Sequence, residues 1–186
     1  MHFFNYLLFF LFPRIPGSGP TVFMQHGLED SSATWVLAGP EHGAPAFRLA
    51  EAGYDVWLGN FRGNNYARAH VTYQPSDKEF WRFSWDEMAK YDLPAMLNYT
   101  LEQTGKQKIH YVGHSMGTTT FMAMNSLDQS WADRVELAVL LAPVAFMDNM
   151  ESPLRYLAPF IGAFDVDLKH LFFIFQWVTI LYLVDS

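Results

Sequence analysis

Four short apolar runs, separated by segments with helical patterns, constrain the fold of this chain most strongly. They span residues 21–27, 53–60, 108–115 and 135–143. Each run is continuously apolar rather than alternating, which is typical of parallel strands covered on both faces. Because helical segments lie between these runs, the sequence predicts an α/β fold with a mostly parallel sheet and flanking helices.

Residues 84–105 carry the clearest helical pattern. Ser84 and Glu87 have the spacing of a capping box, and Gly105 is placed to end the helix. Pro94 lies inside the pattern and is expected to kink it. Two further helices are expected at residues 43–52 and 116–128.

Composition and charge exclude several classes of function. The 186 residues are 51% hydrophobic and 17% charged, as in a globular domain with a core. A net charge of −7 argues against nucleic-acid binding, which requires a basic surface. The chain has no cysteine, and its seven histidines show no metal-ligand spacing, so neither a metal nor a cofactor is expected.

A serine between two glycines indicates nucleophilic chemistry. Gly113, Ser115 and Gly117 form a G-x-S-x-G motif, with an apolar run before it and small residues after it. In a nucleophile elbow, this motif places the serine on a sharp turn between strand and helix. The alternative is an ordinary glycine-bounded turn in which the serine only caps the helix, but the flanking segments favour the elbow.

Acyl transfer also requires backbone N–H groups that stabilise the oxyanion. In an elbow, the residue after the nucleophile supplies one of them, which is Met116 here. Leu28 follows His26-Gly27 at the end of the first apolar run and is placed to supply the other. Alone, the His-Gly pair would be read as an ordinary strand exit; with the elbow downstream, it predicts an oxyanion loop.

The histidines beside the motif are not expected to act as the base. His114 precedes the serine directly, and side chains next to the nucleophile of an elbow point away from it. We expect both His114 and His110 to have structural roles.

Longer stretches of the sequence resemble one known family. The segments "FMQHGLEDSSATWV", "GYDVWLGNFRGNNYARAHVTY", "EFWRFSWDEMAKYDLPAMLNY", "KIHYVGHSMGTT" and "LLAPVAFM" are similar to the acid lipases, which include gastric and lysosomal enzymes with the α/β-hydrolase fold. The resemblance runs from about Arg14 to about Phe160. It implies a serine ester hydrolase of triacylglycerols or sterol esters, with Ser115 as nucleophile and Leu28 and Met116 as oxyanion donors. It also implies a secreted or lysosomal location, and it allows contact with a lipid interface.

The chain departs from the family pattern at several points. The family usually has glutamine where Met116 stands, and its catalytic acid and histidine lie well over 100 residues beyond the serine. After Ser115, the candidate groups are a single histidine and a few nearby acids, none of which matches a family motif: His170, Asp165, Asp167 and Asp185. We therefore expect an internal part of a family sequence, with exposed sheet edges and impaired catalysis. The alternative is a non-catalytic lipid-binding or regulatory fragment.

The sequence predicts three regions. Residues 14–150 are expected to form a partial α/β-hydrolase core, residues 1–13 an apolar N-terminal segment, and residues 151–186 the start of a lid region with an aromatic-rich tail. The first segment reads as a weak secretion signal, a buried strand or a foreign end. The apolar run Leu171 to Val184 is too short to cross a bilayer as a helix. Asn98 begins an N-glycosylation triplet, which matters only in a secreted chain.

Overall fold

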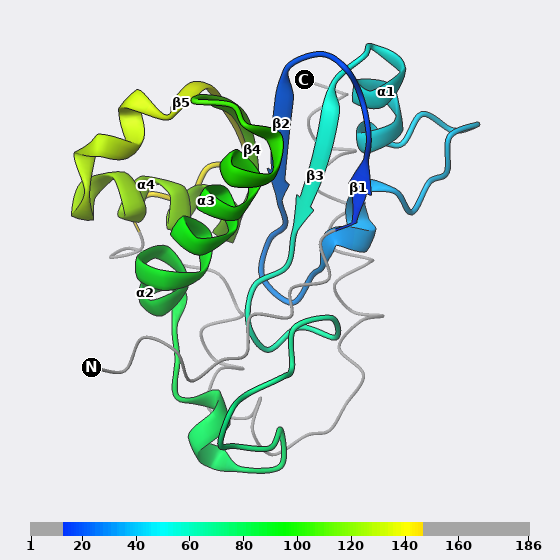
Figure 1. The fold of residues 1–186 in the computed structure, drawn as a ribbon. Helices are drawn as coiled ribbons and strands as arrows, with labels where there is room; N and C mark the ends of the chain where they lie inside the picture. The colour runs from blue at the N-terminus through cyan, green and yellow to red at the C-terminus, as the bar shows by residue number, and fades with distance from the viewer. Residues whose placement is uncertain (1–12, 147–186) are drawn as a thin grey trace. The chain divides into compact units, whose positions relative to one another are not determined.

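A five-stranded sheet organises the protein, and the computed structural model describes residues 13–146 of the chain (Figure 1). The strands lie in the order β1-β3-β2-β4-β5. Strands β2, β3, β4 and β5 pair in parallel, and β1 pairs antiparallel with β3. The bounds are β1 Arg14–Ile15, β2 Thr21–Gln25, β3 Asp55–Gly59, β4 Ile109–His114 and β5 Val135–Leu141.

The predicted α/β class and mostly parallel sheet are thus confirmed, and each of the four apolar runs contains a strand. Strand β1 was not predicted, because two residues are too few for a periodic pattern. It pairs with two residues of β3 and becomes the edge strand itself, and no strand of residues 13–146 pairs with its outer side, as expected for an exposed edge.

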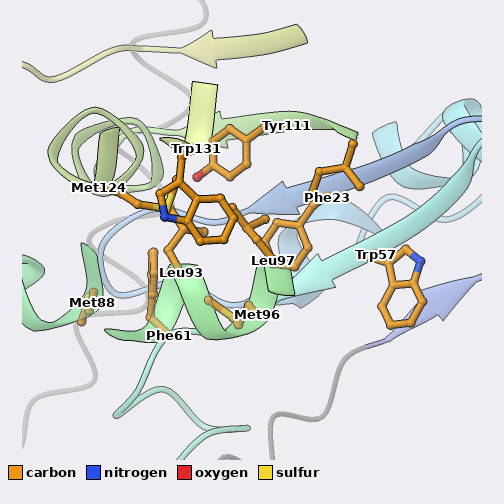
Figure 2. Packing of buried hydrophobic residues seen from close by; sticks show 11 residues of the cluster. Phe23, Trp57, Phe61, Met88, Leu93, Met96, Leu97, Tyr111, Met124 and Trp131 are labelled. Atoms are coloured by element: carbon orange, nitrogen blue, oxygen red, sulfur yellow. The ribbon is translucent and has the colours of Figure 1, made fainter. Parts of the chain in front are cut away.

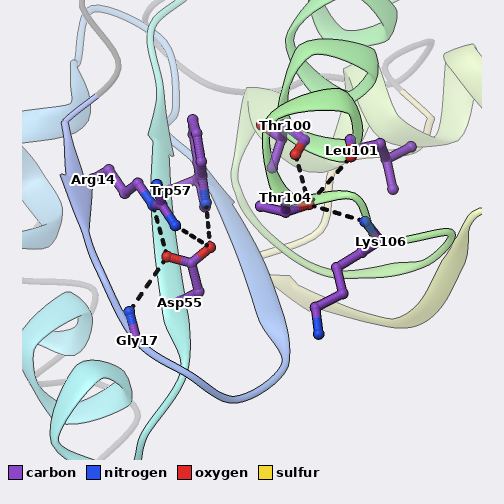
Figure 3. Close-up of polar contacts among 8 residues, drawn as sticks. All are labelled: Arg14, Gly17, Asp55, Trp57, Thr100, Leu101, Thr104 and Lys106. Carbon is purple, nitrogen blue, oxygen red and sulfur yellow. Dashed lines mark hydrogen bonds and ion pairs between the residues drawn. The ribbon is translucent and has the colours of Figure 1, made fainter.

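Asp55 fastens β1 to the sheet (Figure 3). Its carboxylate accepts hydrogen bonds from Arg14 Nε at 2.8 Å and Trp57 Nε1 at 2.8 Å, and from the backbone N–H of Gly17 at 3.4 Å. Burial raises the pKa of Asp55, but these donors outweigh it and hold the pKa below its ordinary value. The stabilisation is therefore present above the unfolded-state pKa and is lost as the pH falls through the folded-state pKa.

The predicted helix at 84–105 forms in three pieces. Its bounds are α2 Trp85–Glu87, a π-helical turn η3 Met88–Asp92 and α3 Leu93–Thr104. The Ser84–Glu87 capping box is present, and Gly105 ends α3 in a left-handed conformation with φ of 65°. The expected irregularity near Pro94 takes the form of the π turn, which leaves proline in the first turn of α3, where no intrahelical N–H is needed.

The other predicted helices are confirmed as α1 Pro45–Glu51 and α4 Met116–Leu127. The sequence did not predict the short 3₁₀ segments. They are η1 Ser32–Trp35, η2 Lys78–Trp81 and η4 Gln129–Asp133.

Both faces of the sheet are packed, as the continuous apolar runs predicted. On one face, Phe23 of β2 and Tyr111 of β4 pack with Leu93 and Leu97 of α3 and with Met124 of α4 (Figure 2). A second cluster joins the other side of these strands to α1 and η1, and it is built from Val22, Met24, Trp35, Ala46, Val56 and Leu58. Alternate residues of each central strand thus serve opposite faces.

Strand β5 departs from the expectation of a strand buried on both faces. Among the described residues, Leu137, Val139 and Leu141 are 56%, 41% and 43% exposed. They alternate along the strand, so they share one face of it. The expected exposed edge is present here, because no strand of residues 13–146 pairs with the outer side of β5.

The remaining regional predictions lie outside the described residues. They concern residues 1–12 and 147–186, which include the N-terminal apolar segment, the lid region and the run at 171–184. Within residues 13–146, every helix is too short or too polar to cross a membrane.

Candidate functional site

Ser115 lies in a strained turn between β4 and α4. Its φ and ψ are 50° and −115°, a left-handed conformation that costs free energy for any residue other than glycine. Hydrogen bonds hold the turn on both sides. The Ser115 N–H donates to the carbonyl of Leu141 at 3.0 Å, and the Ser115 carbonyl accepts from the N–H and the hydroxyl of Thr118 at 2.8 Å and 2.6 Å. This is the backbone geometry that the G-x-S-x-G motif predicted.

The glycines around Ser115 are required by close packing. A methyl group on Gly117 would lie 2.7 Å from the carbonyl oxygen of Gln25 and 2.9 Å from that of His26. A methyl group on Gly113 would lie 3.0 Å from the Gly117 carbonyl. Helix α4 can therefore begin against the end of β2 only because these positions carry no side chain.

Gly27 brings the loop after β2 to the serine. A methyl group on Gly27 would lie 3.1 Å from Ser115 Cβ and 3.2 Å from His114 Nδ1. Parallel pairing of β2 with β4 explains this approach, because the carboxyl ends of the two strands reach the same end of the sheet (Figure 1). The predicted oxyanion loop therefore passes close to the predicted nucleophile.

Backbone strain marks the same end of the sheet. Among the described residues, three non-glycine residues have positive φ: Glu29 at 55°, Ser115 at 50° and Ala142 at 47°. They follow β2, β4 and β5. Strain of this kind persists where the surrounding structure enforces it, often at functional sites.

The N–H groups of the two predicted oxyanion donors have no acceptor in the described part of the chain. Within residues 13–146, neither the Leu28 N–H nor the Met116 N–H donates a hydrogen bond. Met116 is the first residue of α4, where helix geometry leaves the N–H without an intrahelical acceptor. Leu28 follows the glycine that touches Ser115. One donor without an acceptor among residues 13–146 thus follows the serine and the other follows Gly27, and their role as an oxyanion hole stays a prediction.

Several supports of the turn were missed by the sequence reasoning. The Tyr111 hydroxyl donates to the Gly117 carbonyl at 2.7 Å, and its ring stacks on Phe121 at 4.4 Å. The Thr119 hydroxyl donates to the carbonyl of Val144 at 2.7 Å, which ties the segment after β5 to α4. The run of threonines after the motif was the available signal, but it had been interpreted only as small helix residues.

His26, the residue after β2, has a structural role that the sequence did not predict. Its ring is buried and bonded on both sides, to Gly27 and to the segment after β3. Burial lowers the pKa of His26 to about 4. Since the unfolded-state value is 6.5, the stability that depends on the neutral ring is complete above pH 6.5 and is lost as the pH falls toward about 4.

None of the described histidines acts on the serine side chain. Among residues 13–146, no side chain hydrogen-bonds to Ser115 Oγ. His110 packs its ring against Tyr54, and burial lowers the pKa of His114, which interacts electrostatically with Asp30. The structural roles expected for His110 and His114 agree with these contacts. His170 and its neighbouring acids lie outside the described residues.

The predicted glycosylation triplet, residues 98–100, lies in a folded helix. Asn98 lies within α3 and accepts a hydrogen bond from Arg134 at 2.8 Å. Thr100 of the same triplet is fully buried and donates to the Met96 carbonyl. These contacts hold the triplet within the folded helix, and a glycan at Asn98 stays a prediction that matters only in a secreted chain. In the described part of the chain, no group of three potential ligands could hold a metal ion.

Known sequences and structures agree with this architecture. The sequence profile of a family described as the alpha/beta hydrolase fold matches residues 20–174. Among solved structures, a marine microorganism esterase aligns with a TM-score of 0.53 at 21% identity, covering 83% of this chain and 49% of the esterase. An epoxide hydrolase mutant from Vigna radiata aligns with a TM-score of 0.51 at 19% identity, covering 80% of this chain and 40% of that enzyme. At these identities the structural likeness shows the fold alone.

Curated relatives are much more similar in sequence. The gastric triacylglycerol lipase of Rattus norvegicus is 50% identical over 139 residues, which are 75% of this chain and 35% of the rat protein. Lipase lipl-1 of Caenorhabditis elegans is 47% identical over 156 residues, 81% of this chain and 38% of the worm protein. This chain therefore spans less than half the length of these relatives. It belongs to the α/β-hydrolase fold family, and its sequence resembles the acid lipases within it.

Proposed function

We propose that this chain carries the nucleophile and oxyanion donors of a serine ester hydrolase that acts on lipid esters. The observation that carries the proposal is the strained Ser115, which lies close to Gly27. The N–H groups of Leu28 and Met116, the residues after Gly27 and after the serine, have no acceptor among residues 13–146. In the reaction, Ser115 Oγ attacks the ester carbonyl carbon and loses its proton to a base. The N–H groups of Leu28 and Met116 stabilise the oxyanion. When it collapses, the ester C–O bond breaks, the alcohol leaves with the proton that the base took from Ser115, and the acyl group stays on Oγ.

Water then attacks the acyl-enzyme and releases the fatty acid. The base of a serine hydrolase is usually a histidine oriented by an acid. Because no described histidine bonds to Ser115, we propose that both groups come from outside residues 13–146. A chain without them would retain only the residual catalysis that oxyanion stabilisation and substrate binding provide.

The relatives support the proposed class of substrate. Their names include triacylglycerol lipases, which supports a lipid ester as substrate. Sterol esters and a secreted or lysosomal location are proposed on the acid-lipase resemblance, together with contact at a lipid interface.

A non-catalytic lipid-binding or regulatory role is the second candidate. It is favoured by one observation, the absence of a base bonded to Ser115 within residues 13–146. In such a protein, an acyl chain would bind beside the serine without reacting.

Labelling with a fluorophosphonate distinguishes the two functions. We expect the full chain to be labelled, at the reduced rate of a serine that depends on oxyanion stabilisation, and Ser115→Ala to lose all labelling. Ser126→Ala is the matched control, since Ser126 lies near the far end of the same helix, and it should label as the wild type does. An unlabelled wild type that still binds a fatty acid would support the non-catalytic role.

A further inference from the structure

The ring of His26 connects two loops at the carboxyl end of the sheet. It is 2% exposed. Its Nδ1 lies 2.7 Å from the carbonyl oxygen of Gly27, the next residue. On the other side, Nε2 lies 3.1 Å from the backbone nitrogen of Phe61 and 3.1 Å from Asn64 Nδ2. A buried ring therefore joins the loop after β2 to the loop after β3.

These contacts fix the protonation of the ring. A carbonyl oxygen can only accept a hydrogen bond, so Nδ1 must carry a proton. A backbone N–H can only donate, so Nε2 must offer a lone pair to Phe61. Both bonds exist only in the neutral Nδ1–H tautomer. A second proton on Nε2 would remove the acceptor that Phe61 and Asn64 use.

The hydrogen bond from His26 Nδ1 to the Gly27 carbonyl orients the peptide group that joins Gly27 to Leu28. The carbonyl of Gly27 and the N–H of Leu28 belong to one planar trans peptide, so they point in opposite directions. A hydrogen bond that fixes the carbonyl therefore also fixes the direction of the Leu28 N–H. This N–H has no acceptor among residues 13–146 and follows the glycine that touches Ser115.

The other end of the loop after β2, at Ser32, is also hydrogen-bonded to the segment after β3. Asn60 accepts from the Ser32 N–H at 2.9 Å and donates to the Ser32 hydroxyl at 3.0 Å. Asn64 donates to Asn60 Oδ1 at 2.8 Å and thereby joins this contact to His26. The intervening Glu29 has a positive φ, as expected where a short loop is held at both ends.

We propose that His26 is a positioning residue: braced by Phe61 and Asn64, its ring holds the Gly27 carbonyl and so aims the Leu28 N–H at the oxyanion of a reacting ester. The statement that the Leu28 N–H points at an oxyanion rests on the proposed function. The bracing itself does not depend on Ser115 being reactive. The ionisable side chain that acts on His26 is His114, at the end of β4, and Asp30 acts in turn on His114.

A titration of the full chain, labelled with ¹⁵N at histidine and leucine, tests the bracing without any reaction. We expect His26 to be the Nδ1–H tautomer at pH 7 and to gain its second proton near pH 4. The Leu28 amide resonance should shift with the same midpoint, while that of buried Leu97 in α3 stays unchanged. His114 is read separately in the same spectra. An Nε2–H tautomer, or a Leu28 amide that ignores the titration of His26, would overturn the proposal.

Two variants test the effect on the serine. The amide N–H of asparagine can replace Nδ1–H as donor to Gly27, so His26→Asn should keep the rate constant kinact of fluorophosphonate labelling within about threefold. Leucine has no donor, so His26→Leu should lower kinact by at least about tenfold with KI unchanged, since loss of a whole oxyanion donor costs about 10²–10³. His110→Leu, which replaces a half-buried histidine of β4, should label as the wild type does.

The outcomes separate the two proposals. If the wild type labels and His26→Leu labels at the same kinact, the positioning role is wrong while the proposed function stands. If the wild type and His110→Leu both fail to label, the proposed function fails, and the ¹⁵N titration alone decides whether His26 braces the loop. If His26→Leu does not fold, the ¹⁵N titration alone tests whether His26 braces the loop.

Discussion

Replacing Gly117 by alanine is expected to destabilise the protein by about 3 kcal/mol, near the upper end of the cost of overpacking a well-packed site. The new methyl group would lie 2.7 Å and 2.9 Å from the carbonyl oxygens of Gln25 and His26. Both are backbone atoms at the end of β2, whose pairing with β3 and β4 prevents an easy shift. The helix that begins after Ser115 must move instead, and urea unfolding measures the loss.

The same substitution should slow fluorophosphonate labelling by about 100-fold, because small misplacements of reacting groups cost rates of this order. Gly105→Ala is the matched control. That glycine has a positive φ of 65°, which Gly117 does not have, and a methyl group there would meet open space. It should cost about 1–2 kcal/mol of backbone strain and leave labelling unchanged. Equal stability of the two variants, with labelling at the wild-type rate, would show that the elbow does not depend on this contact.

Replacing Asp92 by alanine is expected to cost about 3–5 kcal/mol, the usual loss when one partner of a buried ion pair is removed. Asp92 is 1% exposed and receives Arg62 Nε at 2.8 Å and 2.9 Å on its two carboxylate oxygens. The backbone N–H of Arg62 donates to it as well, at 3.2 Å. The substitution would leave a buried guanidinium without its carboxylate and would release the loop after β3 from the π turn.

Two further variants make this prediction specific. Glu51→Ala removes the exposed pair between Arg48 and Glu51 and should cost no more than about 1 kcal/mol. The double variant Arg62→Met with Asp92→Leu should recover most of the loss, because apolar side chains of similar size often replace a buried pair without penalty. A loss below about 1 kcal/mol for Asp92→Ala in urea unfolding would mean that this pair does not hold the loop.

Local sequence patterns predicted the parts of the fold that depend on local chemistry. The capping box at Ser84 and the left-handed Gly105 form within a few residues of chain, so their spacing was sufficient. The same holds for Ser115, whose flanking strand and helix are contiguous with it. The approach of Gly27 to Ser115 followed from the rule that parallel strands end at the same side of a sheet.

The features that the sequence could not predict depend on distant partners. Strand β1 is two residues long and is fixed by Asp55, 41 positions away from Arg14. The bond between His26 and Phe61 joins residues 35 positions apart. The exposure of Leu137 in β5 reflects which neighbours the strand has, and an apolar run carries no information about its neighbours.

The central claim is that the loop after β2 and the start of α4 form one oxyanion site beside Ser115. A crystal structure of the chain after reaction with a fluorophosphonate tests it most directly. We predict a phosphonate ester on Ser115 Oγ whose free oxygen lies about 2.7–3.1 Å from both the Leu28 and Met116 nitrogens. An adduct oxygen bonded to only one of these groups, or directed away from the loop after β2, would contradict the account.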